Sequence, residues 1–367
     1  MLSVFCSPSR YVQGRDATGA LGDQMRKVGL DGPAYILATQ RTAGLLGQTW
    51  SDSLTSAGID YLVGDFGGEC TEDEISAGTQ RARDAKANVV VGAGGGKALD
   101  TARAIAANLE IPVVNCPTLA SSDAPCSALS VVYDANGTFA KLLFYPRNPD
   151  LVLVDTTLVA QAPRRFLVSG MGDALATWFE ARTVIEACKP NQVHGGTTLT
   201  GGALARLCYD TLRADGPAAA AAVDSCAVTP ALERVVEANT LLSGLGFESG
   251  GLAIAHSVHN GLTTAPATHD YLHGEKVAFG LLVQLVVEGR PTSEFTDVCR
   301  FSLEVGLPTT LTDIGLSADD EPALRVIAER TIAEGETAHN EPFEVTAEAI
   351  FDGIRTANCL AAAEIAK

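Results

Sequence analysis

A glycine-rich break between an apolar run and a helical segment limits the possible folds of this chain more than any other feature. Residues 89–101 are VVVGAGGGKALDT, in which three valines lead into a block of glycines and a helix-forming segment follows Lys97. A short, wholly apolar run bounded by glycines is typical of a strand buried on both faces. The stretch therefore predicts a parallel sheet covered by helices.

The surrounding segments alternate between strand and helix patterns. Thr71 and Glu74 have the spacing of a capping box, which predicts a helix that continues to Ala87, and a second helix is expected from about Gly95 to Leu109. Apolar runs predict strands over residues 34–38, 59–63, 89–91, 112–115 and 151–154. This order of elements favours a parallel sheet within an α/β domain.

Two further regions have different patterns. Residues 127–133 and 138–145 flank Asp134-Ala135-Asn136-Gly137, which predicts a β-hairpin with an Asn-Gly turn. After Pro163, strand patterns almost disappear, and Ala, Leu and Glu recur at helical spacing, with an alanine-rich helix expected over 217–224. We therefore predict an α/β domain over residues 1–162 and an all-helical domain over residues 163–367.

Length, charge and cysteine usage exclude several classes of protein. A chain of 367 residues is long enough for two domains, and its net charge of −18 argues against a nucleic-acid or anionic-membrane partner. The nine cysteines are scattered without a C-x-x-C pair, which indicates reduced thiols in a cytoplasmic protein. No signal peptide is predicted, and the longest apolar segment, residues 277–287, is too short to cross a bilayer.

The glycine block resembles a phosphate-binding loop but matches neither common motif. A P-loop requires glycine and Ser or Thr where this chain has Val91 and Ala98, and the G-x-G-x-x-G pattern requires glycine where it has Lys97. The physical basis still applies, because glycines allow close backbone approach and the next helix presents unpaired N–H groups. The alternative is a tight turn without a ligand.

A second polar loop, PTLASSDAPCS at residues 117–127, follows the next predicted strand. It lies at the same carboxyl edge of the sheet, where open α/β folds bind ligands. Its small hydroxylated residues around Asp123 suit contact with a polar ligand. Alternatively, Ser122 and Asp123 cap a turn.

Four of the six histidines lie within 18 residues, at positions 256, 259, 269 and 273. The members of each close pair are three or four residues apart and can share a helix face. Such a cluster favours a metal site, although single histidines are more often core or surface residues. A catalytic metal needs three protein ligands, and the glycine-flanked Asp173 is one candidate carboxylate among several acids.

Taken together, the motifs resemble those of glycerol dehydrogenases in the metal-dependent, iron-containing type of alcohol dehydrogenase superfamily. The resemblance covers nearly the whole chain. It implies a dehydroquinate synthase-like fold, with a dinucleotide-binding domain over 1–162, a metal-binding and catalytic domain over 163–367, and the active site in the cleft between them. The motifs that carry it are VQGRDATGALG, DFGGEC, GAGGGKALDTA, PTLASSDAPCSALSVVY, GMGDALATWFEAR, TPALERVVEANTLLSGLGFESGGLAIAHSVHNGLT, HGEKVAFG and AEGETAHN.

The resemblance also implies roles for individual residues. Asp173, His256 and His273 would hold a catalytic zinc ion, with His259 and His269 beside it, and Asp123 would face the hydroxyls of the substrate. The residues implied at the NAD cofactor are Thr39, Gly94, Gly95, Gly96, Lys97, Asp100, Thr118, Ser121, Ser127, Leu129 and Tyr133.

The implied reaction is oxidation of glycerol, or a related small vicinal diol, at C2 to dihydroxyacetone with hydride transfer to NAD. Members of the family are usually homo-oligomers, often homo-octamers. This sequence departs from the family at the end of the first predicted strand, where Thr39 follows Ala38 in place of the usual aspartate. That departure predicts weaker discrimination against NADP.

Two other functions are compatible with parts of this pattern. A lyase of the dehydroquinate synthase type would need a basic pocket for phosphate and carboxylate, and no arginine or lysine cluster accompanies the histidines. A non-catalytic nucleotide-binding regulator or oligomeric scaffold would bind a dinucleotide without turnover. The full set of metal ligands together with Asp123 argues against that second alternative.

Overall fold

The chain forms two compact units in a computed structural model that describes residues 1–134 and 137–367. The sheet unit contains Cys6–Pro163 and Ala221–Gly244, and the helical unit contains Met1–Phe5, Arg164–Ala220 and Leu245–Lys367. The first part of the chain forms a parallel sheet with helices, and the second part is helical. This arrangement confirms the predicted fold class. The assignment of 1–162 to dinucleotide binding and 163–367 to catalysis stays a prediction.

The sheet unit is built on six parallel strands in the order β1-β8-β5-β4-β2-β3. The strand over 34–38 was predicted to the residue, and β4 continues three residues beyond the predicted Val91 into the glycine block. The short β1 was not predicted. The strands are β1 Tyr11–Gly14, β2 Ala34–Ala38, β3 Tyr61–Asp65, β4 Val89–Gly94, β5 Val113–Pro117 and β8 Leu151–Asp155.

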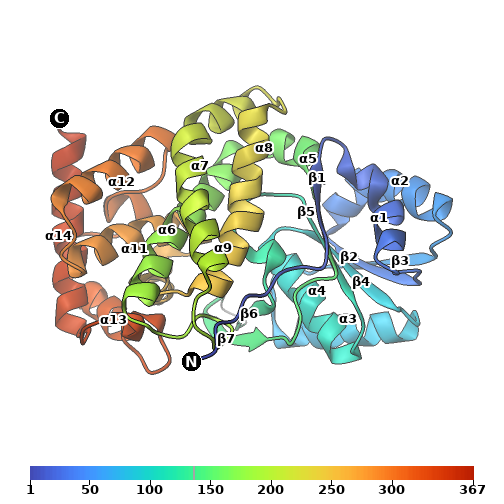
Figure 1. Ribbon diagram of the computed structural model, residues 1–367, viewed down its shortest axis with the longest axis horizontal. Helices are drawn as coiled ribbons and strands as arrows, with labels where there is room; N and C mark the ends of the chain where they lie inside the picture. The colour runs from blue at the N-terminus through green and yellow to red at the C-terminus, as the bar shows by residue number, and fades with distance from the viewer. Residues whose placement is uncertain (135–136) are drawn as a thin grey trace. The chain divides into compact units, whose positions relative to one another are not determined.

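Helices cover both faces of this sheet, as Figure 1 shows. Side chains alternate along a strand, so Ile36 and Val91 lie on one face of the sheet. There they pack against helices α1 (Leu21–Lys27) and α2 (Gln40–Ser56), which contributes Trp50. Their neighbours Leu37 and Val90 pack on the opposite face, against α3 (Glu72–Asp84) and α4 (Gly96–Leu109). Burial on both faces explains why these strands are uniformly apolar.

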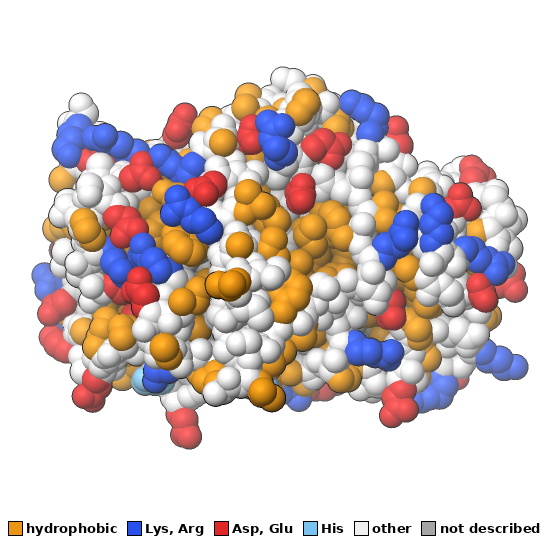
Figure 2. Space-filling view, viewed as in Figure 1, with side chains coloured by type: hydrophobic (Ala, Val, Ile, Leu, Met, Phe, Trp, Pro, Cys, Tyr) orange, Lys and Arg blue, Asp and Glu red, His pale blue; other side chains and the backbone are white. Residues whose placement is uncertain are grey.

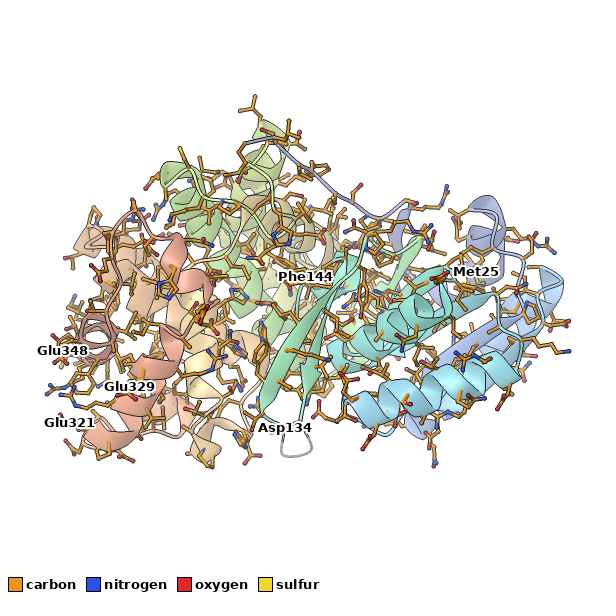
Figure 3. The ribbon with its side chains drawn as sticks, turned by 90° about the horizontal axis from the view of Figure 1, so that it is seen from below. Met25, Asp134, Phe144, Glu321, Glu329 and Glu348 are labelled. Carbon is orange, nitrogen blue, oxygen red and sulfur yellow. The ribbon has the colours of Figure 1, made fainter. Side chains whose placement is uncertain are left out.

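The predicted hairpin is present as the antiparallel strands β6 (Leu129–Tyr133) and β7 (Phe139–Phe144). Figure 3 shows Asp134 at the described end of the turn and Phe144 toward the other end of the hairpin. Two residues of the predicted Asn-Gly turn, Ala135 and Asn136, lie outside the described residues. The remaining elements of this unit include α5 (Thr156–Gln161), α8 (Pro230–Glu237), the π-helical η3 (Ala238–Leu242) and the 3₁₀ turns η1 (Ala17–Ala20) and η2 (Ala124–Cys126).

The helical unit is organised around α11 (His273–Val287), which packs against α6, α10, α12 and α14. Its residues 277–285 are all buried, so the longest apolar segment of the sequence is a core helix. No described helix has the length and apolarity needed to cross a membrane. The other elements that lie wholly or mostly in this unit are α6 Arg164–Glu186, α7 Leu199–Asp224, α9 Ser243–Gly250, α10 Ile254–Leu262, η4 Pro266–Thr268, α12 Thr292–Val305, η5 Thr312–Ile314, α13 Glu321–Thr331, η6 Thr337–Asn340 and α14 Ala347–Ile365.

Charged side chains of both signs are interspersed on the face shown in Figure 2. In the helical unit, Arg325 lies between Glu321 and Glu348, at 2.7 and 3.0 Å, and Arg300 pairs with Glu364 at 2.6 Å. The exposed pairs of Arg325 contribute little to stability individually.

Candidate active site

Two glycines bring helices α6 and α11 into backbone contact beside the predicted metal ligands. A Cβ atom on Gly274 would lie 1.8 Å from the carbonyl oxygen of Ser169, and one on Gly172 would lie 2.3 Å from the carbonyl oxygen of Gly274. No larger residue fits at either position without moving a helix. The glycines in the motifs GMGD and HGEK thus place Asp173 of α6 next to His273 of α11.

The three predicted ligands meet in the helical unit. Asp173 Oδ1 is 3.3 Å from His256 Nε2 and 3.2 Å from His273 Nε2, and one ligand atom from each residue lies within 4.8 Å of the other two. Asp173 is fully buried, whereas 31% of the His273 side chain is exposed. Two imidazole nitrogens and one carboxylate oxygen are a donor set that zinc and iron both accept.

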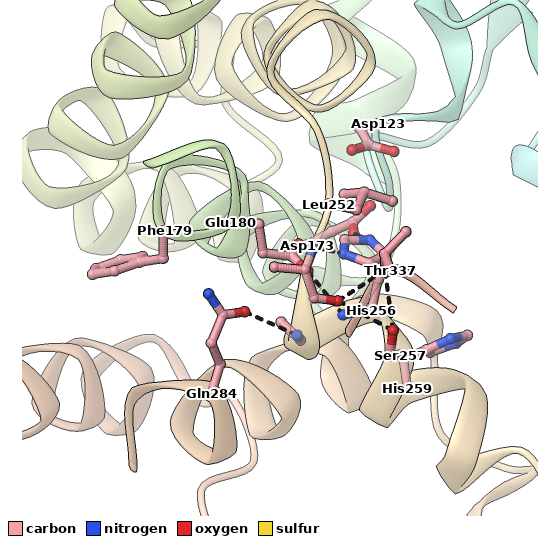
Figure 4. Close-up of polar contacts among 12 residues, drawn as sticks. Asp123, Asp173, Phe179, Glu180, Leu252, His256, Ser257, His259, Gln284 and Thr337 are labelled. Atoms are coloured by element: carbon pink, nitrogen blue, oxygen red, sulfur yellow. Dashed lines mark hydrogen bonds and ion pairs between the residues drawn. The ribbon is translucent and has the colours of Figure 1, made fainter. Parts of the chain in front are cut away.

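A buried glutamate fixes the orientation of His256, as Figure 4 shows. Glu180 Oε2 lies 2.6 Å from His256 Nδ1, and Glu180 Oε1 accepts hydrogen bonds from the backbone N–H groups of Ala253 at 2.9 Å and His256 at 3.1 Å. When the Nδ1–H group donates a hydrogen bond to Glu180 and Nε2 carries no proton, the lone pair of Nε2 is free to bind a metal ion. A metal-binding histidine needs this tautomer.

The charges of these groups depend on one another. Burial alone would raise the pKa of Asp173, but the charge of His273 and hydrogen bonds from both imidazoles hold it well below its usual value. Burial alone would lower the pKa of His256, whereas Glu180 and then Asp173 raise it well above its usual value. The site therefore stabilises an ionised carboxylate and attracts positive charge.

The other two histidines of the cluster have different surroundings. His259 is buried, and its ring centroid lies 4.1 Å from that of His273. Burial, and then the charges of His273 and Lys276, lower the pKa of His259 well below its usual value, so its ring is neutral. His269 is exposed, and its Nε2 lies 3.0 Å from the carbonyl oxygen of Thr263.

A segment near the C-terminal end of the chain holds the start of α10, which carries His256. Thr337 Oγ1 donates to the carbonyl oxygen of Ala253 at 2.8 Å, and the Ala338 N–H donates to Ser257 Oγ at 2.8 Å (Figure 4). Asn340 Nδ2 donates to the carbonyl oxygen of Leu252 at 2.8 Å. The AEGETAHN motif thus fixes the helix that bears one of the three predicted ligands.

In the sheet unit, several of the predicted cofactor residues lie at the carboxyl ends of neighbouring strands. Gly94 ends β4, Gly95 precedes α4, and Gly96 and Lys97 form its first turn. The Thr118 N–H, just after β5, donates to the Gly94 carbonyl at 3.0 Å. A Cβ atom on Gly96 would lie 3.3 Å from Ser122 Oγ, so the two predicted loops adjoin. The first turn of α4 lies at this edge, its N-cap Gly95 makes no side-chain cap hydrogen bond among the described residues, and such a helix N-terminus favours phosphate.

The hairpin adds further predicted cofactor residues at this edge. Leu129 begins β6 and Tyr133 ends it, and Lys97 Nζ lies 5.1 Å from the centroid of the Tyr133 ring. Lys97 also pairs with Glu69 at 2.5 Å. Ser121 is partly buried, and Ser127 is fully buried, with its hydroxyl donating to the Ala124 carbonyl.

Two of the predicted cofactor residues make contacts that hold elements of the sheet unit in place. Asp100 is buried and pairs with Arg103, and its second carboxylate oxygen accepts a hydrogen bond from the Val131 N–H at 3.2 Å. Asp100 therefore ties α4 to β6. Thr39 is the N-cap of α2, where its Oγ1 accepts a hydrogen bond from the Thr42 N–H at 3.2 Å. The roles of both residues in cofactor binding stay predictions.

Asp123 is buried in the loop before η2 of the sheet unit. Its Oδ2 accepts a hydrogen bond from Ser243 Oγ at 3.0 Å, and a Cβ atom on Gly244 would lie 3.0 Å from its carbonyl oxygen. The carboxylate is thus oriented by a segment 120 residues away. Its contact with a substrate stays a prediction.

Comparison with known proteins supports the resemblance seen in the motifs. A family model described as iron-containing alcohol dehydrogenase matches residues 8–156. A glycerol dehydrogenase from Thermotoga maritima is 49% identical over 98% of this chain and 97% of its own, and a glycolaldehyde reductase from Halobacterium salinarum is 48% identical over 98% of each. The crystal structure of a probable glycerol dehydrogenase from Sinorhizobium meliloti matches with a TM-score of 0.94 and 40% identity, covering 99% of this chain and 100% of that one.

The chain belongs to the iron-containing alcohol dehydrogenase family. It is therefore an oxidoreductase, and the suspected family relationship is confirmed.

Glu180 is a site residue of this alcohol dehydrogenase that the sequence analysis missed. A single glutamate in a helical segment usually lies on the surface, and the pattern gave no reason to treat this one differently. A signal was nevertheless present, because Glu180 follows Asp173 by seven residues, which is two helical turns and hence the same face of α6.

Proposed function

We propose that this alcohol dehydrogenase is a zinc-dependent enzyme that oxidises glycerol at C2 to dihydroxyacetone, with NAD as the hydride acceptor. The grouping of Asp173, His256 and His273 within 4.8 Å carries the proposal, in a chain 49% identical to a glycerol dehydrogenase. Related small vicinal diols are alternative substrates, because the same two adjacent hydroxyls are present.

The three residues suit a catalytic metal rather than a structural one. They provide three protein ligands, which is the number typical of catalytic rather than structural zinc sites. A zinc ion there would act as a Lewis acid and would lower the pKa of a substrate hydroxyl toward neutral pH. The buried, ionised Asp173 offsets part of the ion's charge, and Glu180 keeps His256 in the tautomer that binds metal.

Residues of the sheet unit would bind and orient the organic reactants. The backbone of Gly94–Gly96 and the first turn of α4 would bind the pyrophosphate of NAD, with Lys97 neutralising charge and Tyr133 contacting the dinucleotide. Asp123, fixed by Ser243, would accept hydrogen bonds from the hydroxyls of glycerol. We also propose that the enzyme is cytoplasmic and forms homo-octamers, a state that light scattering on the purified protein would measure.

Initial rates with a panel of substrates test the proposed reaction. We expect glycerol-dependent formation of NADH, slower turnover with NADP, and dihydroxyacetone as the product identified by chromatography. Because one relative is named a glycolaldehyde reductase, NADH oxidation with glycolaldehyde should be measured in parallel. A kcat/KM for glycolaldehyde far above that for both glycerol and dihydroxyacetone would replace the proposed substrate.

Asp123→Asn tests the role given to Asp123. The variant should lower kcat/KM for glycerol about 10- to 100-fold, because a charged hydrogen-bond acceptor is lost, and leave the Kd for NADH nearly unchanged. A defect mainly in NADH binding would place Asp123 at the cofactor instead.

A further inference from the structure

The motif DFGGEC begins with the last residue of β3 and continues into the following loop, and none of the proposed catalytic steps uses it. We propose that Glu69 of this loop holds Lys97 in the cofactor-free protein, and that an incoming dinucleotide must displace it. Glu69 then sets the affinity for the cofactor by competing with the pyrophosphate for the same lysine. The inference rests on the dinucleotide site proposed above.

The contact joins two groups of opposite charge at the first turn of α4. Glu69 Oε2 lies 2.5 Å from Lys97 Nζ, and the same ammonium lies 5.1 Å from the centroid of the Tyr133 ring. The side chains of Lys97 and Glu69 are 49% and 31% exposed. Lys97 is thus accessible to a ligand from solvent but already engaged by a carboxylate.

The loop that carries Glu69 is fixed at both ends, so this ion pair differs from a chance contact between two mobile side chains. Phe66 is buried, and its N–H donates to the Ala38 carbonyl of the neighbouring strand at 2.9 Å. Cys70 is fully buried, and its carbonyl oxygen accepts a hydrogen bond from the Tyr133 N–H at 2.9 Å. Between these anchors, Gly68 has a φ of +103°, a conformation that glycine adopts without strain.

The same loop is therefore connected to two residues implied at the cofactor, through Glu69 to Lys97 and through the Cys70 carbonyl to Tyr133. Glu69 Oε1 also accepts a hydrogen bond from the Cys70 N–H at 3.2 Å, which orients its carboxylate. A carboxylate held in this position opposes a pyrophosphate in two ways. It occupies the lysine, and it repels the negative charge of the phosphates.

Equilibrium binding to Glu69→Gln tests the inference, with Glu72→Gln as the matched control. Glu72 lies three residues further on and pairs with Lys141 at 2.5 Å, so its substitution removes the same charge from the same region without touching Lys97. The probes are NADH and ADP-ribose, which carry the pyrophosphate, and adenosine, which carries no phosphate. Circular dichroism and thermal unfolding of both variants check that the fold is retained.

We expect Glu69→Gln to lower the Kd for NADH and for ADP-ribose about three- to tenfold, because the competing and repelling charge is lost. Binding of adenosine should not change, and Glu72→Gln should change each Kd less than twofold. The gain should diminish as the salt concentration rises. Glu69→Asp, which keeps the charge on a shorter side chain, provides a second variant if the glutamine form is unstable, and it should give an intermediate Kd.

Four results would overturn the inference. Weaker binding of NADH by Glu69→Gln would mean that Glu69 positions Lys97 for the cofactor, and an unchanged Kd, or an equal gain in Glu72→Gln, would mean that the ion pair has no specific role. Failure of the unmodified protein to bind NADH or ADP-ribose would instead contradict the proposed dinucleotide site, and the inference with it.

Discussion

The two units of this alcohol dehydrogenase present their functional residues on different kinds of backbone. In the helical unit, the three predicted metal ligands lie on helices, and buried partners such as Glu180 fix their orientation. In the sheet unit, most of the predicted cofactor residues lie in loops and at element ends beside the sheet, and Lys97 is half exposed. The first arrangement holds atoms at fixed distances, and the second leaves groups accessible to a large ligand.

This difference determines what substitutions should do in each unit. A change at the metal ligands or at their buried partners should reduce metal content and, with it, all turnover. A change among the cofactor residues should alter affinity or selectivity and leave metal content and stability nearly intact. The following variants test that contrast.

His256→Ala should have the largest effect, because it removes one of three protein ligands. We expect the bound metal to fall to a small fraction of one ion per chain and kcat/KM for glycerol to fall about 1,000-fold or more. Metal analysis and initial rates measure both effects. His194→Ala, which removes an exposed histidine outside the cluster, should keep both the metal and the activity. Full activity in a metal-free His256→Ala protein would refute the metal mechanism.

Glu180→Ala should weaken metal binding about 10- to 100-fold, because His256 loses the acceptor that fixes its tautomer and orientation. Competition with a chelator measures the metal Kd directly, without reference to activity. Glu186→Ala is the matched control, since Glu186 lies at the end of the same helix and pairs with Arg290 instead. Equal metal affinity in both variants would remove Glu180 from the site.

Glu341 provides a test of stability within the helical unit. It is buried, neither carboxylate oxygen has a hydrogen-bond partner among the described residues, and burial followed by repulsion from Glu288 and Glu180 raises its pKa from 4.5 to about 9. The folded protein therefore holds a proton there that the unfolded chain releases. This bound proton stabilises the folded protein relative to the unfolded chain. The stabilisation is complete below pH 4.5 and is lost as the pH rises toward 9.

Glu341→Gln should remove this dependence on pH. Relative to the unmodified protein, the variant should gain about 1–3 kcal/mol of unfolding free energy between pH 5 and pH 8. Denaturant unfolding at several pH values measures the difference. Glu344→Gln, at an exposed position three residues later, should show no such gain. A difference between the variant and the unmodified protein that stays constant with pH would show that Glu341 keeps an ordinary pKa.

Thr39→Asp should have the smallest effect and should be confined to cofactor choice. Aspartate also caps helices well, so α2 should be retained, and its charge would repel the extra phosphate of NADP. We expect the ratio of kcat/KM for NAD to that for NADP to rise about three- to tenfold. If the unmodified protein already rejects NADP as strongly as Thr39→Asp does, residue 39 does not set the choice. Asp65→Asn would then test the exposed carboxylate on β3, whose backbone lies opposite Ala38.

Local patterns predicted much of the sheet unit. The strand over 34–38 and the helix over 96–109 need only a continuous apolar run or a helical period, and both are present in the sequence. The strand β1 was missed because Tyr11–Gly14 is short and half buried, and it pairs with β8 about 140 residues later. Contacts between distant segments, such as Ser243 with Asp123, leave no local pattern to recognise.

The candidate metal site could be predicted from the sequence only in part. The histidine cluster indicated a metal from spacing alone, whereas the flanking glycines favoured Asp173 over other acids only weakly until the family resemblance was considered. The close packing of Gly172 and Gly274, which brings Asp173 and His273 together, depends on two helices separated by about 100 residues. Glu180 was not predicted, because burial of a single glutamate is decided by tertiary packing rather than by local sequence.

The most direct test of the account is a titration of the metal-free protein with zinc, followed by its rate of glycerol-dependent NADH formation. We predict no turnover after chelation, a linear recovery that ends at one zinc ion per chain, and no recovery in His256→Ala. Unchanged turnover in protein shown to contain no metal would contradict the claim that Asp173, His256 and His273 hold the catalytic ion.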